Sequence, residues 1–193
     1  MGLAVLGLLS GGPLHPYRMQ RLMKEWGKDQ VVNVGQRANL YKTIKRLNEA
    51  GLVVVQQTER DQRYPERTVY ELTEEGGRTL RAWLTDMLST PRNEYPLFPA
   101  ALSFLMLMAP ADARVVLERR AAVLEESVAA LDRELAQYTD ALPRVTVLET
   151  EYQRAATAAE LAWVNGAVDD LRTGRLAWSE DDFSAAAQAY LLE

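Results

Sequence analysis

The chain has 193 residues, no cysteine, a single histidine and a formal net charge of −5. This composition excludes a disulfide framework, a thiolate zinc site, a cysteine nucleophile and a metal site built from several histidines of one chain. Residues 1–89 carry 13 Lys and Arg against 10 Asp and Glu, whereas residues 90–193 carry 9 against 17, which indicates a cationic module joined to an acidic one.

The first predicted element is a short apolar helix over Gly2–Leu9, ended by Gly11-Gly12-Pro13. It is too short to span a bilayer, and no basic residue precedes it as in a signal peptide. Because it has little polar face, we expect it to be buried, in a cytoplasmic protein with no membrane partner.

Two more helices are predicted before the first strand. One covers Tyr17 to about Trp26 and ends at Gly27, and the other covers Gln36–Ala50 and ends at Gly51. In the first of these the residues expected to point inward are Tyr17, Met19, Leu22, Met23 and Trp26. In the second, the +4 and +3 spacing predicts burial of Leu40, Ile44 and Leu47.

After residue 51 the spacing of apolar residues is no longer helical, and the sequence predicts a β-hairpin. Leu52–Gln57 and Thr68–Leu72 are rich in Val, Tyr and Thr and flank a charged stretch. Thr73 is placed to cap a fourth helix that ends near Ser89. Three helices, a hairpin and a fourth helix predict a winged helix-turn-helix domain at residues 1–89.

The C-terminal half is predicted to be helical. Three prolines mark a linker at residues 90–99, and the apolar run Pro99–Met108 predicts a buried helix. A long helix over about Ala111–Leu142 has apolar residues at the steps typical of helix-on-helix packing, namely Leu117, Ala121, Leu124, Val128, Leu131, Leu135, Tyr138 and Leu142. A second, over about Val145–Leu171, carries Leu148, Tyr152, Ala155, Ala159 and Ala162.

Ser179 with Asp182 resembles a capping box for a last helix bearing Phe183, Ala187, Tyr190 and Leu191. We therefore expect a mainly α protein with a small β-wing, in which a winged helix-turn-helix domain precedes a long-helix dimerisation domain at residues 100–193. This second domain also offers room for an effector.

No enzyme signature is found. The acidic clusters consist of neighbouring residues, as at Glu125-Glu126 and Asp169-Asp170, and adjacent side chains on a helix point about 100° apart, so they cannot share a proton or a metal. We expect a protein that is not an enzyme and that uses no cofactor and no metal.

The predicted third helix has the composition of a DNA-reading helix. It carries four cations and no acid before Glu49, and it presents Gln36, Arg37, Asn39, Lys42, Thr43 and Arg46 away from its apolar stripe. Arg, Asn and Gln make bidentate contacts to guanine and adenine, and a helix fits the major groove. The alternative is a solvated basic face with no ligand.

The hairpin tip is also basic. It holds Arg60, Arg63 and Arg67, tempered by Asp61 and Glu66. Two strands would carry these cations to phosphates or to a minor groove beside the third helix. A solvated loop is the alternative interpretation.

These residues resemble the PadR family of bacterial transcriptional regulators. The resemblance rests on Leu6-Gly7-Leu8-Leu9, Gly12-Pro13-Leu14-His15-Pro16-Tyr17, Asn39-Leu40-Tyr41, Arg46-Leu47, Gly51-Leu52-Val53, Arg63-Tyr64-Pro65-Glu66-Arg67, Tyr70-Glu71-Leu72-Thr73 and Gly76, and it covers about residues 2–89. It implies a homodimeric winged-helix repressor that a small, often aromatic ligand releases from DNA. The chain departs from the family at Pro16, at Lys42 and at the acidic Glu66 of the wing.

The residues and the resemblance together give three sets of expected sites. Double-stranded DNA is expected at Tyr17, Gln36, Arg37, Asn39, Tyr41, Lys42, Thr43, Lys45, Arg46, Arg60, Arg63 and Arg67. The second copy of a homodimer is expected at Leu117, Leu124, Leu131, Leu148, Tyr152 and Ala159. A small aromatic or hydrophobic effector is expected at Trp83, Phe98, Phe104 and Trp163, for which plain core packing is the alternative.

His15 stands at a predicted helix start, where the helix dipole disfavours its charged form, so we expect a neutral structural histidine. A rival interpretation of the whole chain is a winged-helix adaptor that binds proteins and not DNA, in keeping with its acidic balance. A metal-sensing winged helix is disfavoured, because cysteines are missing and histidine is single.

Overall fold

A computed structural model describes residues 1–27, 37–59, 67–138, 143–179 and 182 of the chain. Its internal contacts divide the chain into two units, Met1–Asn93 and Glu94–Glu193. The units are described in turn. The assignment of residues 1–89 and 100–193 to separate domains joined by a linker stays a prediction.

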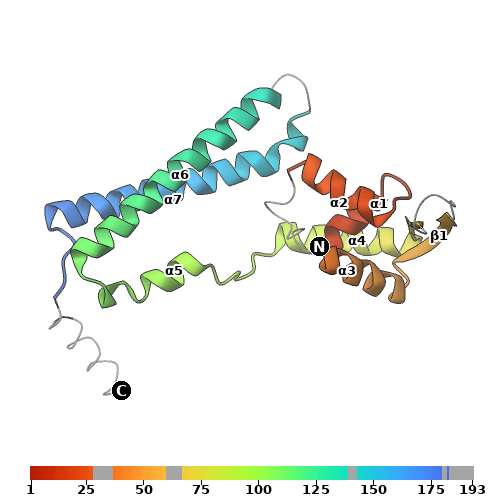
Figure 1. The fold of residues 1–193 in the computed structure, drawn as a ribbon, viewed down its shortest axis with the longest axis horizontal. Helices are drawn as coiled ribbons and strands as arrows, with labels where there is room; N and C mark the ends of the chain where they lie inside the picture. The colour runs from red at the N-terminus through yellow and green to blue at the C-terminus, as the bar shows by residue number, and fades with distance from the viewer. Residues whose placement is uncertain (28–36, 60–66, 139–142, 180–181, 183–193) are drawn as a thin grey trace, which may run out of the picture. The chain divides into compact units, whose positions relative to one another are not determined.

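In its described residues, the N-terminal unit consists of four helices and one hairpin, which can be followed in red to yellow-green in Figure 1. In chain order the elements are α1 (Gly2–Leu9), α2 (Pro16–Glu25), α3 (Arg37–Glu49), β1 (Val53–Glu59), β2 (Arg67–Leu72) and α4 (Glu74–Ser89). The order confirms the predicted winged helix-turn-helix, with the antiparallel pair β1–β2 as the wing.

Local chemistry sets the ends of these helices. The backbone N–H of Leu52 donates to the Leu47 carbonyl at 2.9 Å across Gly51, whose φ of 70° lies in the left-handed region that favours glycine. The Thr73 hydroxyl accepts a hydrogen bond from the N–H of Gly76 at 2.9 Å and so caps α4. Both signals were read correctly from the sequence.

A short bridge ties the start of α2 to the wing. Leu14 and Tyr70 exchange two backbone hydrogen bonds of 3.0 Å each, which adds one residue to the edge of β2. Along the hairpin, Val53 pairs with Leu72 and Glu59 with Arg67, with an irregularity between Val55 and Gln57. The wing is thereby anchored next to the helices that it flanks.

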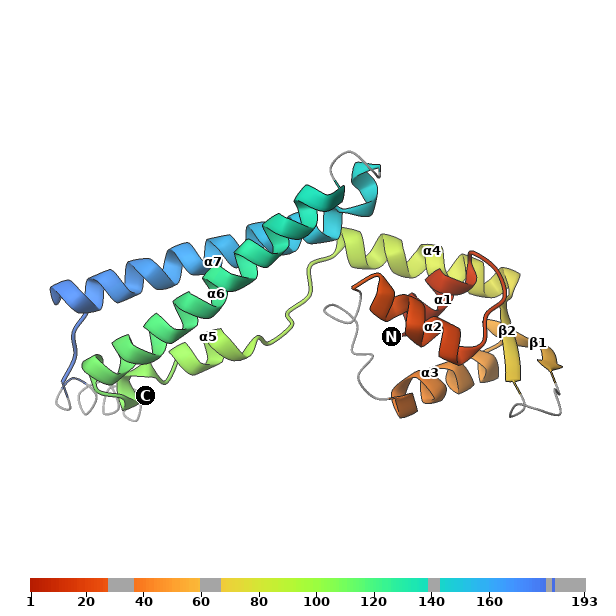
Figure 2. The same ribbon diagram turned by 45° about the horizontal axis from the view of Figure 1, so that its top comes forward.

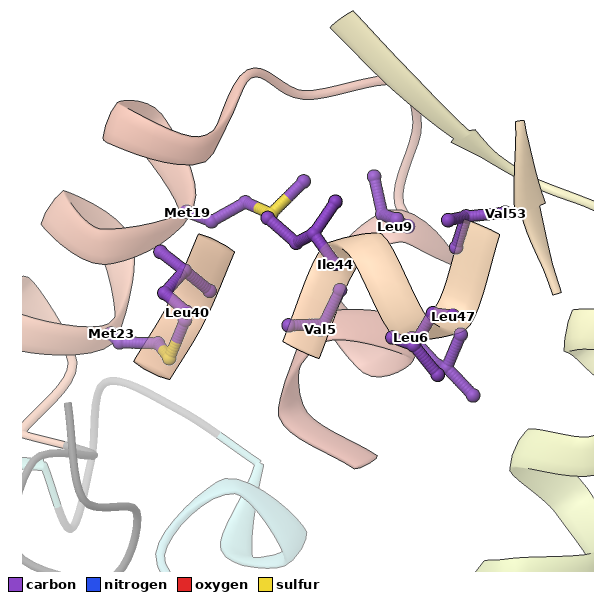
Figure 3. Close-up of a cluster of buried hydrophobic side chains, with 9 residues drawn as sticks. All are labelled: Val5, Leu6, Leu9, Met19, Met23, Leu40, Ile44, Leu47 and Val53. Carbon is purple, nitrogen blue, oxygen red and sulfur yellow. The ribbon is translucent and has the colours of Figure 1, made fainter. Parts of the chain in front are cut away.

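One apolar cluster holds the unit together (Figure 3). Its buried members come from the first three helices and β1: Val5, Leu6, Leu9, Met19, Met23, Leu40, Ile44, Leu47 and Val53. Fully burying an aliphatic side chain is worth about 1.5–3 kcal/mol, so this cluster outweighs the exposed ion pairs around it. The predicted burial of Leu40, Ile44 and Leu47 is confirmed.

The prediction that Tyr17 and Trp26 point inward is wrong. Their side chains are 59% and 58% exposed. The buried stripe of α2 is Pro16, Met19 and Met23, and Tyr17 lies two residues, or about 200°, from Met19 on the helix. The prediction relied on the aromatic character of the two residues. Their burial is instead determined by which side of α2 they occupy, and that side is not the one that carries Met19 and Met23.

The C-terminal unit is built on two long helices that lie side by side in both views (Figures 1 and 2). Its elements are α5 (Leu97–Leu102), the 3₁₀ turn η2 (Leu105–Leu107), α6 (Pro110–Tyr138), the 3₁₀ turn η3 (Arg144–Thr146) and α7 (Leu148–Thr173). Leu117 and Ala121 of α6 pack against Val164 and Val168 of α7. The predicted start of the second long helix at about residue 145 is early, because Arg144–Thr146 is a separate turn.

The prediction of one buried helix over Pro99–Met108 is also wrong. The segment divides between the end of α5 and η2, and Phe104 and Leu107 are 66% and 65% exposed. The buried seam between the two long helices is formed by Leu117, Ala121, Val164 and Val168, and from the short helix it is Phe98 that packs there. A run of apolar residues therefore remains on the surface of the single chain.

The stripe predicted on the second long helix faces away from the seam. Leu148, Tyr152, Ala155, Ala159 and Ala162 are all exposed, and Tyr152 is 74% exposed. The buried residues of α7 are Val164 and Val168, which the stripe did not include. Within one chain, α7 thus has two apolar sides, of which one is covered.

The predicted capping box is present. The Ser179 N–H and hydroxyl both donate to an Asp182 carboxylate oxygen, at 2.7 and 2.8 Å, and the Asp182 N–H donates back to the hydroxyl at 3.2 Å. The helix expected after it, with Phe183, Ala187, Tyr190 and Leu191, lies outside the described residues. In the part of the chain that is described, no helix is long and apolar enough to cross a membrane.

Candidate nucleic-acid interface

The faces of α3 separate apolar from cationic side chains. Leu40, Ile44 and Leu47 point into the core, whereas Asn39, Tyr41, Lys42, Lys45 and Arg46 are exposed and Thr43 is half-buried. Asn39, Lys42 and Arg46 follow at i, i+3 and i+7, so they share one side of the helix. This side offers an amide and two cations to a ligand in solution.

The cations of this face differ in their partners. Lys45 lies 3.8 Å from the Glu49 carboxylate, an exposed pair one turn apart. Neither Lys42 nor Arg46 has a carboxylate within ion-pairing distance among the described residues. These two side chains would not have to leave a protein partner in order to contact a phosphate or a base.

The second helix places an aromatic ring and further cations beside α3. Met19 and Met23 of α2 pack in the same core as Leu40 and Ile44, which fixes one helix against the other (Figure 3). On the exposed side of α2, Tyr17 stacks on His15, with ring centroids 6.1 Å apart. A helix, a connection and a second helix with a cationic outer face have the arrangement by which helix-turn-helix proteins read DNA.

His15 has a structural role at the start of α2. Its Nδ1 accepts a hydrogen bond from the N–H of Arg18 at 3.1 Å. The imidazole therefore serves as the N-cap of the helix, which is the structural role that we expected.

Two arginines of α2 share one carboxylate, a feature missing from the sites expected from the sequence. Arg21 donates from Nε to Glu25 at 2.5 Å, and Arg18 Nη1 lies 3.6 Å from the other oxygen of Glu25. Glu25 raises the pKa of the Arg21 guanidinium, first through this hydrogen bond and then through charge attraction. The i, i+4 spacing of Arg21 and Glu25 was the signal available in the sequence.

Part of the expected DNA surface lies beyond what is described. Gln36, Arg60 and Arg63 fall outside the described residues. Arg37 begins α3 and Arg67 begins β2, but their side chains are outside the described part as well. Their contacts with DNA stay predictions.

The expected effector residues are divided between the two units. Phe98 and Trp163 meet edge to face, with centroids 5.9 Å apart, and the Arg120 guanidinium lies 3.6 Å above the Phe98 ring. Trp83 belongs to the N-terminal unit, where it packs against the core cluster. Phe104 is largely exposed. A cavity lined by all four stays a prediction.

The expected dimer residues fall into two sets. Leu117 and Leu131 are buried within the single chain, so their side chains already have intrachain neighbours, and Leu124 is half-buried at the same seam. Leu148, Tyr152 and Ala159 are exposed. The dimer contact stays a prediction, and the exposed set is the one free to make it.

Comparison with known proteins agrees with this geometry. Residues 5–82 match the family model of the transcriptional regulator PadR-like family. No relative among the curated protein sequences matches the chain. The resemblance to PadR regulators inferred from the sequence is therefore confirmed for this domain.

Three solved structures illustrate the likeness in fold. Bacillus subtilis PadR in complex with operator DNA is 18% identical, with a TM-score of 0.72 over 88% of this chain and 98% of that chain. The same regulator in complex with p-coumaric acid is 16% identical, with a TM-score of 0.71 over 88% of this chain and 97% of that chain. The Vibrio cholerae virulence activator AphA is 18% identical, with a TM-score of 0.64 over 90% of this chain and 99% of that chain. The winged helix followed by long C-terminal helices is thus a shared architecture.

Proposed function

We propose that this chain, whose residues 5–82 form a PadR-like domain, is a sequence-specific DNA-binding transcriptional regulator. The observation that carries the proposal is the division of α3, in which Leu40 and Ile44 are buried while Asn39, Lys42 and Arg46 are exposed on the other side. The helix enters the major groove with that side forward, and β1–β2 brings the wing to the adjacent backbone.

The two halves of the chain differ in charge as DNA binding by the N-terminal half requires: residues 1–89 have an excess of cations and residues 90–193 an excess of acids. Lys and Arg of residues 1–89 neutralise phosphates and supply most of the affinity, so binding falls steeply with salt. The acidic excess of residues 90–193 keeps that half away from the DNA. In this proposal the regulator has no catalytic role and acts in the cytoplasm.

The active form in this proposal is a homodimer. The exposed stripe with Leu148, Tyr152 and Ala159 on α7 supplies an apolar surface, and its alanines allow a second helix to approach closely. A two-fold dimer presents two copies of α3 to half-sites about 34–36 Å apart, which requires a pseudo-palindromic operator.

A small ligand regulates the dimer in this proposal, which makes it a repressor released from its operator. The support is the fold shared with a regulator seen both with operator DNA and with p-coumaric acid. Release requires the ligand to bind the DNA-free form more tightly, because coupling between two sites is reciprocal. The aromatic pair Phe98–Trp163 with Arg120 offers a surface for an aromatic acid.

The test is duplex binding at two salt concentrations. Footprinting near the chain's own gene supplies the operator, and a gel shift at about 50 and 200 mM salt measures the loss of affinity, expected to be steep. Arg37→Ala with Lys42→Ala should abolish the shift. Arg154→Ala with Arg175→Ala removes the same charge from the C-terminal unit and should leave it intact. A protein-binding adaptor would show no salt-sensitive duplex binding with any of these proteins.

A further inference from the structure

One carboxylate on α2 lies between two guanidinium groups. Glu25 accepts from Arg21 Nε through one oxygen at 2.5 Å, and its other oxygen lies 3.6 Å from Arg18 Nη1. All three side chains are partly exposed. Neither arginine takes part in the core, which α2 contacts through Met19 and Met23.

The position of this group matters because of what α2 does in a helix-turn-helix. The first helix of the motif crosses the DNA backbone while the second enters the groove. Arg21 lies one turn after the exposed Tyr17, on the same side of α2, and Tyr17 is close enough to contribute to the raised pKa of Arg21. In the proposed function, where Tyr17 meets DNA, the two arginines are therefore cations of the surface that would meet phosphates.

Some cations of α2 and α3 have a carboxylate partner and others have none. Arg18 and Arg21 are held by Glu25, and Lys45 of α3 lies 3.8 Å from Glu49, whereas Lys42 and Arg46 of α3 have no carboxylate partner among the described residues. A phosphate that approaches Arg21 must compete with the carboxylate and is also repelled by it. A group that approaches α3 meets no such competitor on Lys42 or Arg46.

We infer that Glu25 limits the affinity of the protein for DNA, because it weakens the sequence-independent phosphate contacts of α2 and leaves the base contacts of α3 unrestrained. The inference rests on the proposed function. Phosphate contacts carry no sequence information, whereas base contacts do. Weakening the former on α2 lowers affinity for operator and unrelated DNA by about the same factor, and the ratio between the two affinities is left to the base contacts of α3.

The sharpest test is a gain of binding in Glu25→Gln, which keeps the shape of the side chain and removes its charge. Each added phosphate contact steepens the dependence of log K on log salt by about 0.9. Release of two arginines should steepen the slope for unrelated duplex by about 1–2 and raise its affinity by roughly 3- to 10-fold at low salt. Affinity for the operator should rise by a similar factor, so the ratio between the two affinities stays nearly unchanged.

The experiment measures fluorescence anisotropy with the full chain and two labelled duplexes at about 50 and 200 mM salt. One duplex is selected from a random pool with the unsubstituted protein, and the other is its scrambled sequence. Glu118→Gln is the matched control, because Glu118 also sits between two arginines, Arg114 at 3.1 Å and Arg172 at 3.0 Å, in the acidic half of the chain. It should change neither affinity. Arg21→Ala added to Glu25→Gln should cancel most of the gain.

Each outcome decides between the two ideas. If the unsubstituted protein binds no duplex at low salt, the proposed function is overturned, and the inference with it. If it binds but Glu25→Gln leaves affinity for the scrambled duplex unchanged or lower, Glu25 does not restrain α2, and only the inference is overturned. An equal gain from Glu118→Gln would show an effect of net charge alone and would also overturn it.

Discussion

A Cβ atom on Gly76 would lie 2.0 Å from the carbonyl oxygen of Leu52 and 2.8 Å from Cδ1 of Leu72. The first turn of α4 therefore approaches the backbone before β1 more closely than any side chain permits. Leu52 also accepts the N–H of Thr73 at 3.1 Å, so this oxygen cannot move without loss of a hydrogen bond. The joint between wing and α4 depends on this contact.

Gly76→Ala should destabilise the protein strongly. Overpacking costs about 1–3 kcal/mol in ordinary cases, and a clash with backbone lies at the upper end of that range or above it. The next residue provides a control, because a Cβ on Gly77 meets nothing closer than 3.8 Å. Gly77→Ala should be neutral or stabilising by up to about 1 kcal/mol, since alanine favours the helix. Urea unfolding of both variants measures the contrast, and equal stabilities would contradict it.

The hydrogen bond from Arg18 to His15 predicts a split between two substitutions. His15→Ala removes the Nδ1 acceptor that caps α2 and should cost about 1 kcal/mol. His15→Asn supplies another acceptor at the same position and should recover most of the loss. Both are measured by chemical unfolding at neutral pH. If Asn is as destabilising as Ala, the stacking of the imidazole on Tyr17 stabilises the helix start, and the cap does not.

Much of the N-terminal unit follows from the sequence alone. Gly51 and Thr73 were recognised as the end of one helix and the cap of the next because their chemistry is local. The burial of Leu40, Ile44 and Leu47 on α3 was also predicted correctly, because these three aliphatic residues at helical spacing define one apolar face of the helix.

The sequence was less informative wherever burial depends on distant partners. Tyr17 and Trp26 are apolar enough for a core, but the phase set by Met19 and Met23 places them outside. The stripe on α7 has the right period and lies opposite the side that α6 covers. Periodicity indicates that a face is apolar but not which neighbour covers it. The i, i+4 spacing signals the pair of Arg21 with Glu25, whereas the approach of Arg18 to the same carboxylate, seven residues along the chain, has no comparable local signal.

The ion pair of Arg144 with Glu151 gives stability a dependence on pH. Arg144 donates to both oxygens of Glu151, at 2.8 Å from Nη2 and 3.0 Å from Nε, and lowers the pKa of that carboxyl chiefly through these hydrogen bonds. Because the folded pKa lies below the unfolded one, the stabilisation is present above the unfolded pKa and is lost as pH falls through the folded pKa.

Arg144→Gln should therefore raise the pKa of Glu151 toward its ordinary value. The titration of its side-chain carboxyl carbon by NMR measures this shift, and the stability difference between the two proteins should vanish at acidic pH. Arg175→Gln, which breaks a separate pair with Asp170, is the control and should leave the Glu151 titration unchanged. An unchanged midpoint in Arg144→Gln would contradict the assignment.

The seam between α6 and α7 predicts that packing outweighs charge there. Val164 is fully buried, and Val164→Ala removes about two methyl groups' worth of burial, at a cost of about 2 kcal/mol. Glu160 pairs with Arg120, and both are partly exposed, so Glu160→Gln should cost less than about 1 kcal/mol. Arg120 keeps its contact with the Phe98 ring in that variant. Thermal or urea unfolding ranks the two, and the reverse order would be inconsistent with a seam held by apolar contacts.

The exposed stripe of α7 predicts where the dimer would be broken. Tyr152 is 74% exposed in the single chain, so Tyr152→Glu should leave the helix content unchanged by circular dichroism. In a dimer contact the new carboxylate would be buried without a partner, which is strongly unfavourable. Light scattering should then report the mass of one chain, 21.7 kDa, and operator affinity should fall because the two copies of α3 no longer bind together. Asn165→Glu, exposed on another side of α7, should stay dimeric. A dimeric Tyr152→Glu would place the contact elsewhere, because an apolar interface does not accept an unpaired charge at its centre.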